Sequence, residues 1–66
     1  MSKRLSPREA EIMEWVAQGK TNGEIGQILG CSGLTVKFHL SKIREKLDVH
    51  NKAQAVNVWA EKKRGY

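Results

Sequence analysis

A single cysteine, Cys31, occurs in the 66-residue sequence, so no disulfide can form within the chain and no thiolate cluster can hold zinc. No apolar run is long enough to span a bilayer, and the first residues are not followed by the apolar stretch of a secretory signal. These absences predict a soluble, cytoplasmic protein without membrane association.

Patterns for catalysis and metal binding are also missing. The two histidines, His39 and His50, lie on different predicted elements and lack the paired spacing that a zinc site requires. Catalysis would need a nucleophile with a base, or paired acids in a pocket, and so short a chain has no evident concave site. The sequence therefore predicts neither an enzyme nor a domain that binds a metal, a cofactor or a small molecule.

The length leaves room for one domain, residues 1–66, with a small core and a large exposed surface. Without disulfides or metal, such a domain depends on close helix packing or on oligomerisation. We therefore expect an all-α bundle that is able to dimerise.

Positive charge is present in excess, with 12 lysine and arginine residues against 7 aspartate and glutamate residues and a net charge of +5. A basic domain of this size is typical of proteins that bind polyanions. A basic surface that serves only solubility is the alternative, and charge by itself does not separate the two.

Capping signals divide the chain into four predicted helices. Ser6–Glu9 is a capping box with proline at the first helical position, and Thr21–Glu24 is a second capping box. Gly30 is placed to end the second helix in a left-handed turn, and Ser32 and Asn51 are candidate caps for the last two. The predicted fold is a four-helix bundle with a central helix-turn-helix, and its helices are approximately 7–18, 22–29, 33–47 and 52–63.

The two central helices have the spacing of a helix-turn-helix, in which the first braces the second against the major groove. We expect Ile25, Ile28 and Leu29 to share the buried side of the first. Gly26 adjoins that side, where a missing side chain lets helix 33–47 cross closely. A glycine tolerated by chance is the alternative, at a cost of about 1 kcal/mol.

Helix 33–47 separates into two faces when its residues are placed about 100° apart. The predicted buried stripe consists of Val36, Leu40, Ile43 and Leu47. The opposite arc holds Leu34, Phe38, Ser41 and Glu45, flanked by Lys37 and Lys42. An aromatic ring, a hydroxyl and two cations on one outward face favour a contact surface.

A series of motifs in order along the chain resembles the LuxR-type helix-turn-helix family. These motifs are Leu5–Glu9, Gly19–Asn22, Glu24–Ile25, Ser32, Thr35–Lys37 and Lys46–Leu47. The resemblance implies a DNA-binding output domain of a bacterial transcription regulator, which acts as a dimer on a partly palindromic site. It also implies that the sensing domain is absent from this chain, and it makes RNA polymerase a candidate partner.

Four further features are similar to the branch of that family attached to acyl-homoserine-lactone sensing domains, which implies a role in quorum sensing. They are Trp15, Gly19–Thr21, Gly26 and Phe38–His39. Asp48 departs from the family, which usually has a glycine there, but aspartate tolerates the left-handed conformation better than most residues.

Lys37, Phe38 and Ser41 share the outward arc and match the positions that the family uses to read bases. Lysine suits guanine acceptors, and Phe38 suits a thymine methyl group. Packing of Phe38 beneath a neighbouring helix is the alternative. Phosphate contacts are expected from Lys20, Thr21, Asn22, Thr35, Lys42 and Lys46. Thr21 serving only as a cap, and Lys46 only as a solvated charge, are the alternatives.

Helix 52–63 is unusually apolar. Ala55, Val56 and Trp59 are expected to cover the core, while small side chains on an adjacent face form a strip. We expect a twofold dimer through this strip, with two recognition helices roughly 34 Å apart; a plain surface is the alternative. The predicted interface consists of Ala53, Val56, Asn57 and Ala60.

Two other functions compete with this interpretation. One is a helical protein-interaction module whose basic face meets an acidic partner, and the other is a sigma-factor-like promoter reader. Competition by random duplex DNA at two salt concentrations separates the protein-interaction module from both DNA readers.

Overall fold

The computed structural model describes residues 4–64, which form four α-helices and no strand. The helices are α1 (Pro7–Ala17), α2 (Asn22–Leu29), α3 (Gly33–Leu47) and α4 (Lys52–Arg64). The predicted all-α class is confirmed, and the predicted bounds hold except that α1 ends one residue earlier and α4 one residue later. None of the four helices combines the length and the apolar character needed to cross a bilayer.

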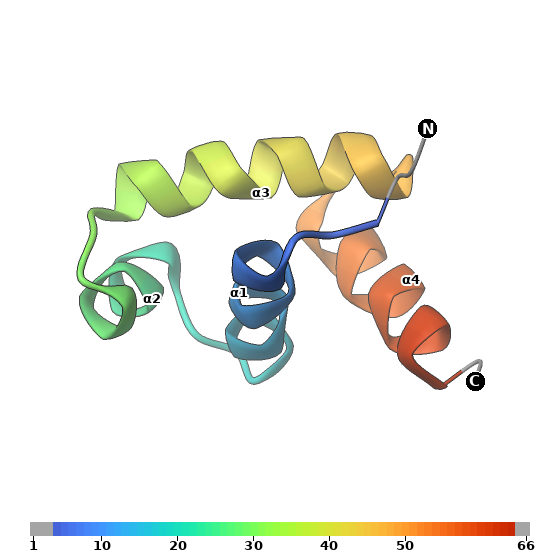
Figure 1. The fold of residues 1–66 in the computed structure, drawn as a ribbon, viewed down its shortest axis with the longest axis horizontal. Helices are drawn as coiled ribbons and strands as arrows, with labels where there is room; N and C mark the ends of the chain where they lie inside the picture. The colour runs from blue at the N-terminus through green and yellow to red at the C-terminus, as the bar shows by residue number, and fades with distance from the viewer. Residues whose placement is uncertain (1–3, 65–66) are drawn as a thin grey trace.

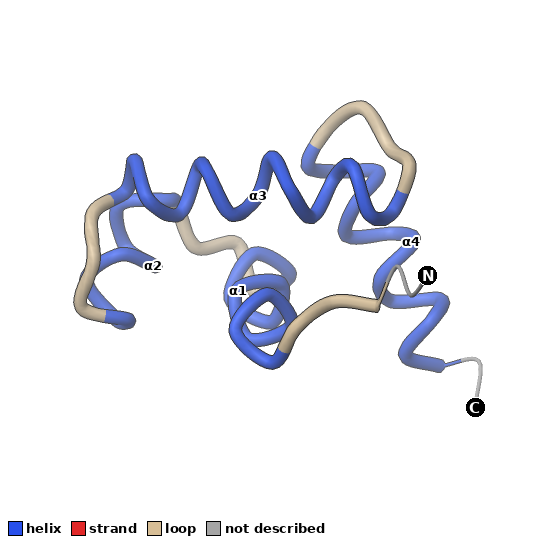
Figure 2. Tube along the Cα trace, turned by 45° about the horizontal axis from the view of Figure 1, so that its top comes forward, coloured by secondary structure: helices blue, strands red, loops and turns tan. Residues whose placement is uncertain are grey.

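The longest helix, α3, organises the bundle. In Figure 1, α1, α2 and α4 all lie on one side of α3, and the opposite side has no helix over it. Figure 2 shows the short connection from α2 at one end of α3 and the loop to α4 at the other end. One long face of α3 is therefore open to a partner.

The predicted capping boxes are both present. Glu9 N donates to Ser6 Oγ over 3.2 Å, and Ser6 N donates to Glu9 Oε1 over 2.8 Å. The equivalent bonds between Glu24 and Thr21 measure 3.1 and 2.8 Å. Each box satisfies two backbone N–H groups that the first turn of a helix leaves without partners.

The other ends follow local backbone chemistry. Gly30 and Asp48 both adopt the left-handed conformation, with φ of 77° and 58°, and end α2 and α3. Asn51 Oδ1 accepts from Gln54 N over 2.9 Å, as a cap should. Gln54 Oε1, however, accepts from His50 N rather than from Asn51 N, one residue earlier than a capping box predicts.

The core draws on all four helices. Its nine buried apolar residues are Ile12, Met13, Val16, Ile25, Val36, Leu40, Ile43, Leu47 and Ala55. The four from α3 are those of the predicted buried stripe, which is confirmed. Full burial of one such large side chain contributes about 1.5 to 3 kcal/mol, so this stripe alone anchors α3 firmly.

Gly26 determines how closely the turn approaches α2. A Cβ atom at Gly26 would lie 2.6 Å from Cys31 O and 2.9 Å from Ser32 C. Because both are backbone atoms, no side chain can swing away to make room. Only glycine fits here, which supports the close-crossing interpretation over a glycine tolerated by chance.

The expectation for Ile28 is wrong, because its side chain is 46% exposed. At about 100° per residue, Ile25, Leu29 and Gly26 fall within an arc of about 100°, and Ile28 lies about 60° beyond Ile25. The turn and α3 pack against the Gly26 side of α2, where Ile25 and Gly26 are buried. The buried stripe is therefore displaced away from Ile28.

Candidate nucleic-acid interface

The outward arc of α3 is open to solvent. Phe38 is 63% exposed and Leu34 is 76% exposed, and Lys37, Ser41 and Lys42 are exposed as well. The two predicted faces of α3 therefore lie where the sequence places them, and Phe38 is not packed beneath a neighbouring helix. The three predicted base-reading side chains, Lys37, Phe38 and Ser41, share this surface.

Lys42 and Phe38 interact within the arc. The ammonium nitrogen of Lys42 lies 5.1 Å from the centre of the Phe38 ring, which is within cation–π range. The contact brings a positive charge beside an apolar ring on a helix face. A surface of this kind can bond a phosphate with the cation while the ring contacts a base edge.

The start of α2 lies among the predicted phosphate-binding residues. Thr21 is exposed, Lys20 and Asn22 are half-buried, and the Thr21 hydroxyl accepts the cap bond from Glu24 N. The hydrogen bond from the Thr21 backbone, assisted by the Thr21 side chain, holds the pKa of Glu24 below its ordinary value. Thr21 is thus a helix cap, and its hydroxyl hydrogen is still able to reach an anion.

Thr35 occupies the corresponding position at the start of α3. Its backbone N–H donates to Ser32 Oγ over 3.1 Å, and the two hydroxyl oxygens are also 3.1 Å apart. Both residues are exposed. The first turn of α3 therefore presents two linked hydroxyls to solvent.

Sequence reasoning missed two cations, Arg44 and Lys52. They line a cavity of about 310 Å³ together with Lys37, Asn22 and Leu40, and Lys52 Nζ donates to Asn22 Oδ1 over 3.3 Å. Arg44 follows Lys37 by seven residues, about two helical turns, so helical spacing could have found it. Lys52 begins α4, and only the fold brings it to Asn22.

Lys46 is engaged within the fold. Its ammonium donates to Glu9 Oε1 over 2.7 Å and to Arg4 O over 3.4 Å. Burial alone raises the pKa of Glu9, but the hydrogen bonds from Lys46 and the Ser6 backbone, with the charge of Lys46, outweigh it and leave the pKa below its ordinary value. This ion pair competes with the expected phosphate contact of Lys46, which the alternative of a solvated charge does not describe either.

On α4, the expected interface strip is accessible. Ala53 and Asn57 are exposed, and Val56 and Ala60 are half-buried. Ala55 is fully buried, and Val56 and Trp59 pack against the core, as expected for the other side of this helix. Elsewhere in residues 4–64, no three histidine, cysteine or acidic side chains lie close enough together to hold a metal ion.

Comparison with known proteins adds an independent observation. The sequence profile of the family described as "Bacterial regulatory proteins, luxR family" matches residues 3–59. This match favours the DNA-binding interpretation over the two alternatives weighed from the sequence.

Individual relatives point the same way. The chain is 55% identical over 53 residues to the HTH-type quorum sensing-dependent transcriptional regulator RpaR of Rhodopseudomonas palustris, covering 80% of this chain and 22% of that protein. It is 51% identical over 51 residues to the HTH-type quorum-sensing regulator RhlR of Pseudomonas aeruginosa, covering 77% and 21%. It is 42% identical over 53 residues to the transcriptional activator protein LuxR of Aliivibrio fischeri, covering 80% and 21%.

The chain spans about a fifth of the length of these relatives. The match nevertheless includes the capping boxes, the helix-turn-helix and most of α4. The chain belongs to the LuxR family of bacterial regulatory proteins.

Proposed function

We propose that this domain binds double-stranded DNA with α3 in the major groove and regulates transcription there. The open outward arc of α3 carries the proposal, because it presents Lys37, Phe38 and Ser41 while the opposite stripe anchors the helix. Lys37 bonds guanine acceptors, Phe38 contacts a thymine methyl group, and Ser41 bonds a base edge.

The backbone contacts come from two ends of the interface. Lys20, Thr21 and Asn22 approach one phosphate at the start of α2, where unpaired backbone N–H groups favour an anion. Thr35 and Lys42 contact the backbone along α3, and Arg44 and Lys52 add a cationic cavity beside Asn22. These contacts set affinity and register, whereas the base contacts set sequence choice.

The domain acts as the output part of a larger quorum-sensing regulator, in keeping with the names of its relatives. We assign dimerisation to the strip Ala53, Val56, Asn57 and Ala60, which is accessible on α4. A twofold dimer places two copies of α3 about one turn of DNA apart. A cytoplasmic location and contact with RNA polymerase follow from the same role, and catalysis has no part in it.

Selection of bound sequences from a random duplex pool tests this function. The expected result is a partly palindromic motif whose half-sites are centred about 10 base pairs apart. Failure to enrich any sequence would contradict sequence-specific binding. Enrichment of a single half-site, together with a monomeric sedimentation mass on that DNA, would contradict the dimer alone.

A further inference from the structure

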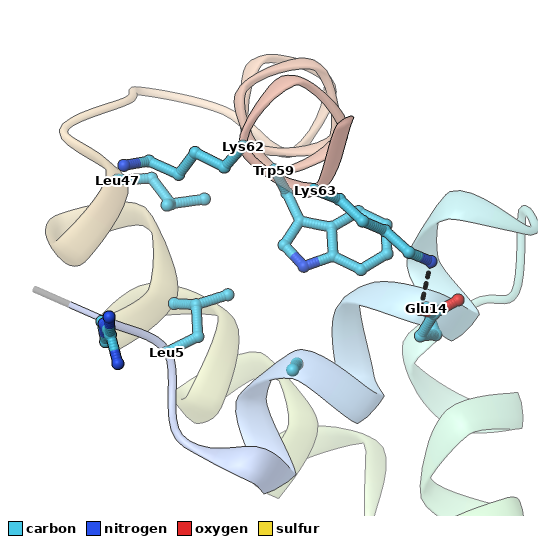
Figure 3. Close-up of a pocket in the computed structure, with 8 residues that line it drawn as sticks. Leu5, Glu14, Leu47, Trp59, Lys62 and Lys63 are labelled. Carbon is cyan, nitrogen blue, oxygen red and sulfur yellow. Dashed lines mark hydrogen bonds and ion pairs between the residues drawn. The ribbon is translucent and has the colours of Figure 1, made fainter. Parts of the chain in front are cut away.

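A second surface lies where the N-terminal segment, α1, α4 and the end of α3 meet. It is a groove of about 490 Å³, and none of the outward-arc residues lines it. Figure 3 shows Leu5, Leu47 and Trp59 converging on it from three segments. Together with Ala10 they give it a largely apolar floor, which the bundle leaves without a partner among residues 4–64.

The rim of this groove is positive. Arg4, Lys62 and Lys63 line it, and Glu14 is its one acidic residue. Lys63 Nζ bonds Glu14 Oε2 over 2.6 Å and also lies 4.9 Å from the centre of the Trp59 ring. In Figure 3, Lys62 extends from α4 toward Leu47, and Lys63 extends toward Glu14. Two cations thus flank the apolar floor, and one of them is held by an exposed, replaceable ion pair.

We propose that this groove binds an acidic peptide segment of a partner protein. A large apolar side chain of the peptide lies against Leu5, Leu47 and Trp59, and carboxylates on either side of it meet Lys62 and Lys63. The peptide carboxylate takes the place of Glu14 beside Lys63. This binding is separate from DNA recognition, because the two surfaces share no residue.

Charge decides between the possible occupants. A second copy of the chain carries a net charge of +5 and would bring like charges together at a basic rim. A DNA backbone would meet an apolar floor that offers its phosphates no donor. An acidic and apolar peptide is the one class that satisfies both the floor and the rim.

The probe is the peptide acetyl-Glu-Asp-Leu-Phe-Glu-Glu-Leu-Asp-amide, titrated into the ¹⁵N-labelled chain and followed by NMR. We expect saturable shifts at the backbone amides of Leu5, Ala10 and Leu47 and at the Trp59 indole N–H. A peptide with alanine in place of leucine and phenylalanine, and one with lysine in place of the acids, should each bind at least about tenfold more weakly.

Two substitutions shift the affinity in opposite directions. Lys62→Ala removes a rim cation and should weaken binding about two- to fivefold, whereas Glu14→Gln frees Lys63 and should strengthen it by about twofold or more. Arg8→Ala, which removes an exposed cation outside the groove, is the matched control and should change little. Opposite effects separate recognition from a loss of folding, which circular dichroism checks independently.

Equal binding of the lysine peptide, or shifts centred on Lys37, Phe38 and Lys42, would overturn the proposal. So would shifts at the groove that depend on protein concentration without peptide, because they would identify a second copy as the occupant. Absence of saturable binding at millimolar peptide would overturn it too.

Discussion

Lys46 Nζ lies 2.7 Å from Glu9 Oε1 and joins the last turn of α3 to the capping box of α1, across 37 positions of sequence. The Glu9 side chain is only 6% exposed, and Ser6 N shares the same carboxylate oxygen. One acidic group therefore caps a helix and ties two helices together. Such a pair contributes more than an exposed ion pair, because solvent screens it less.

Removing the cation tests this role. Lys46→Ala should lower the free energy of unfolding by about 1 to 3 kcal/mol, since it leaves a buried carboxylate with one partner fewer. Urea denaturation measures the change, with Lys62→Ala as the control for loss of an exposed lysine. Binding of the folded variant to DNA should keep its salt dependence; a decrease of about one in the slope would instead restore the expected phosphate contact.

The same pair predicts a dependence of stability on pH. Because folding lowers the pKa of Glu9, its contribution is present above the ordinary glutamate value of about 4.5 and is lost as the pH falls through the folded-state value. The stability difference between the wild type and Glu9→Gln should therefore shrink as the pH falls from 6 to about 3. Glu45→Gln, which removes an exposed carboxylate, should not reproduce that convergence.

Lys37 and Lys42 should differ in the kind of binding that they support. Lys42→Ala should weaken binding to all sequences and lower the salt slope by about one, whereas Lys37→Ala should cost about 1 to 3 kcal/mol, mainly on the preferred site. Fluorescence anisotropy on preferred and random duplexes at several salt concentrations measures both. Equal losses on the two kinds of DNA for both variants would remove the distinction.

Phe38→Ala should relax sequence preference at one base pair and leave the fold intact. The ring is 63% exposed, so its removal should change stability by no more than about 0.5 kcal/mol. Affinities for a set of single-base variants of the preferred site measure the first effect, and thermal unfolding measures the second. A large loss of stability would show that the ring supports the fold instead.

Arg44 and Lys52 should act as backbone contacts. Arg44→Ala and Lys52→Ala should each weaken specific and random binding alike and lower the salt slope by about one. Arg8→Ala removes one positive charge outside the proposed interface and is the control. A slope unchanged by both substitutions would exclude the cavity beside Asn22 from the interface.

Two glycines of α2 should respond in opposite ways to the same substitution. Gly26→Ala places a methyl group against backbone atoms of the turn and should destabilise the domain by about 1 to 3 kcal/mol. Gly23→Ala has only Thr21 Oγ1 at 4.0 Å and should stabilise it by about 0.4 to 1 kcal/mol. Thermal unfolding measures both, and similar changes would show that the turn adapts.

Local chemistry accounts for most of what the sequence predicts. A hydroxyl cap, a glutamate three residues later and a residue that tolerates the left-handed conformation act within a few positions, so Ser6, Thr21 and Asp48 could be assigned from the chain alone. The buried and outward faces of α3 follow from helical spacing. Both also satisfy the requirement that local preference and core packing agree.

Predictions failed where distant segments decide the outcome. Ile28 has an apolar side chain at helical spacing, but the side of α2 that faces the turn depends on where α3 crosses. Lys46 could not be paired with Glu9, nor Lys52 with Asn22, because 37 and 30 positions separate them. Single-sequence periodicity contains no term for such contacts.

Because three helices pack on the same side of α3, inheritance of the fold is decoupled from choice of operator. Substitutions on the outward arc can retarget a descendant to a new promoter without passing through an unfolded intermediate, since the four anchoring residues stay in place. One scaffold is thereby able to diversify its regulon stepwise, at little risk to the molecule itself.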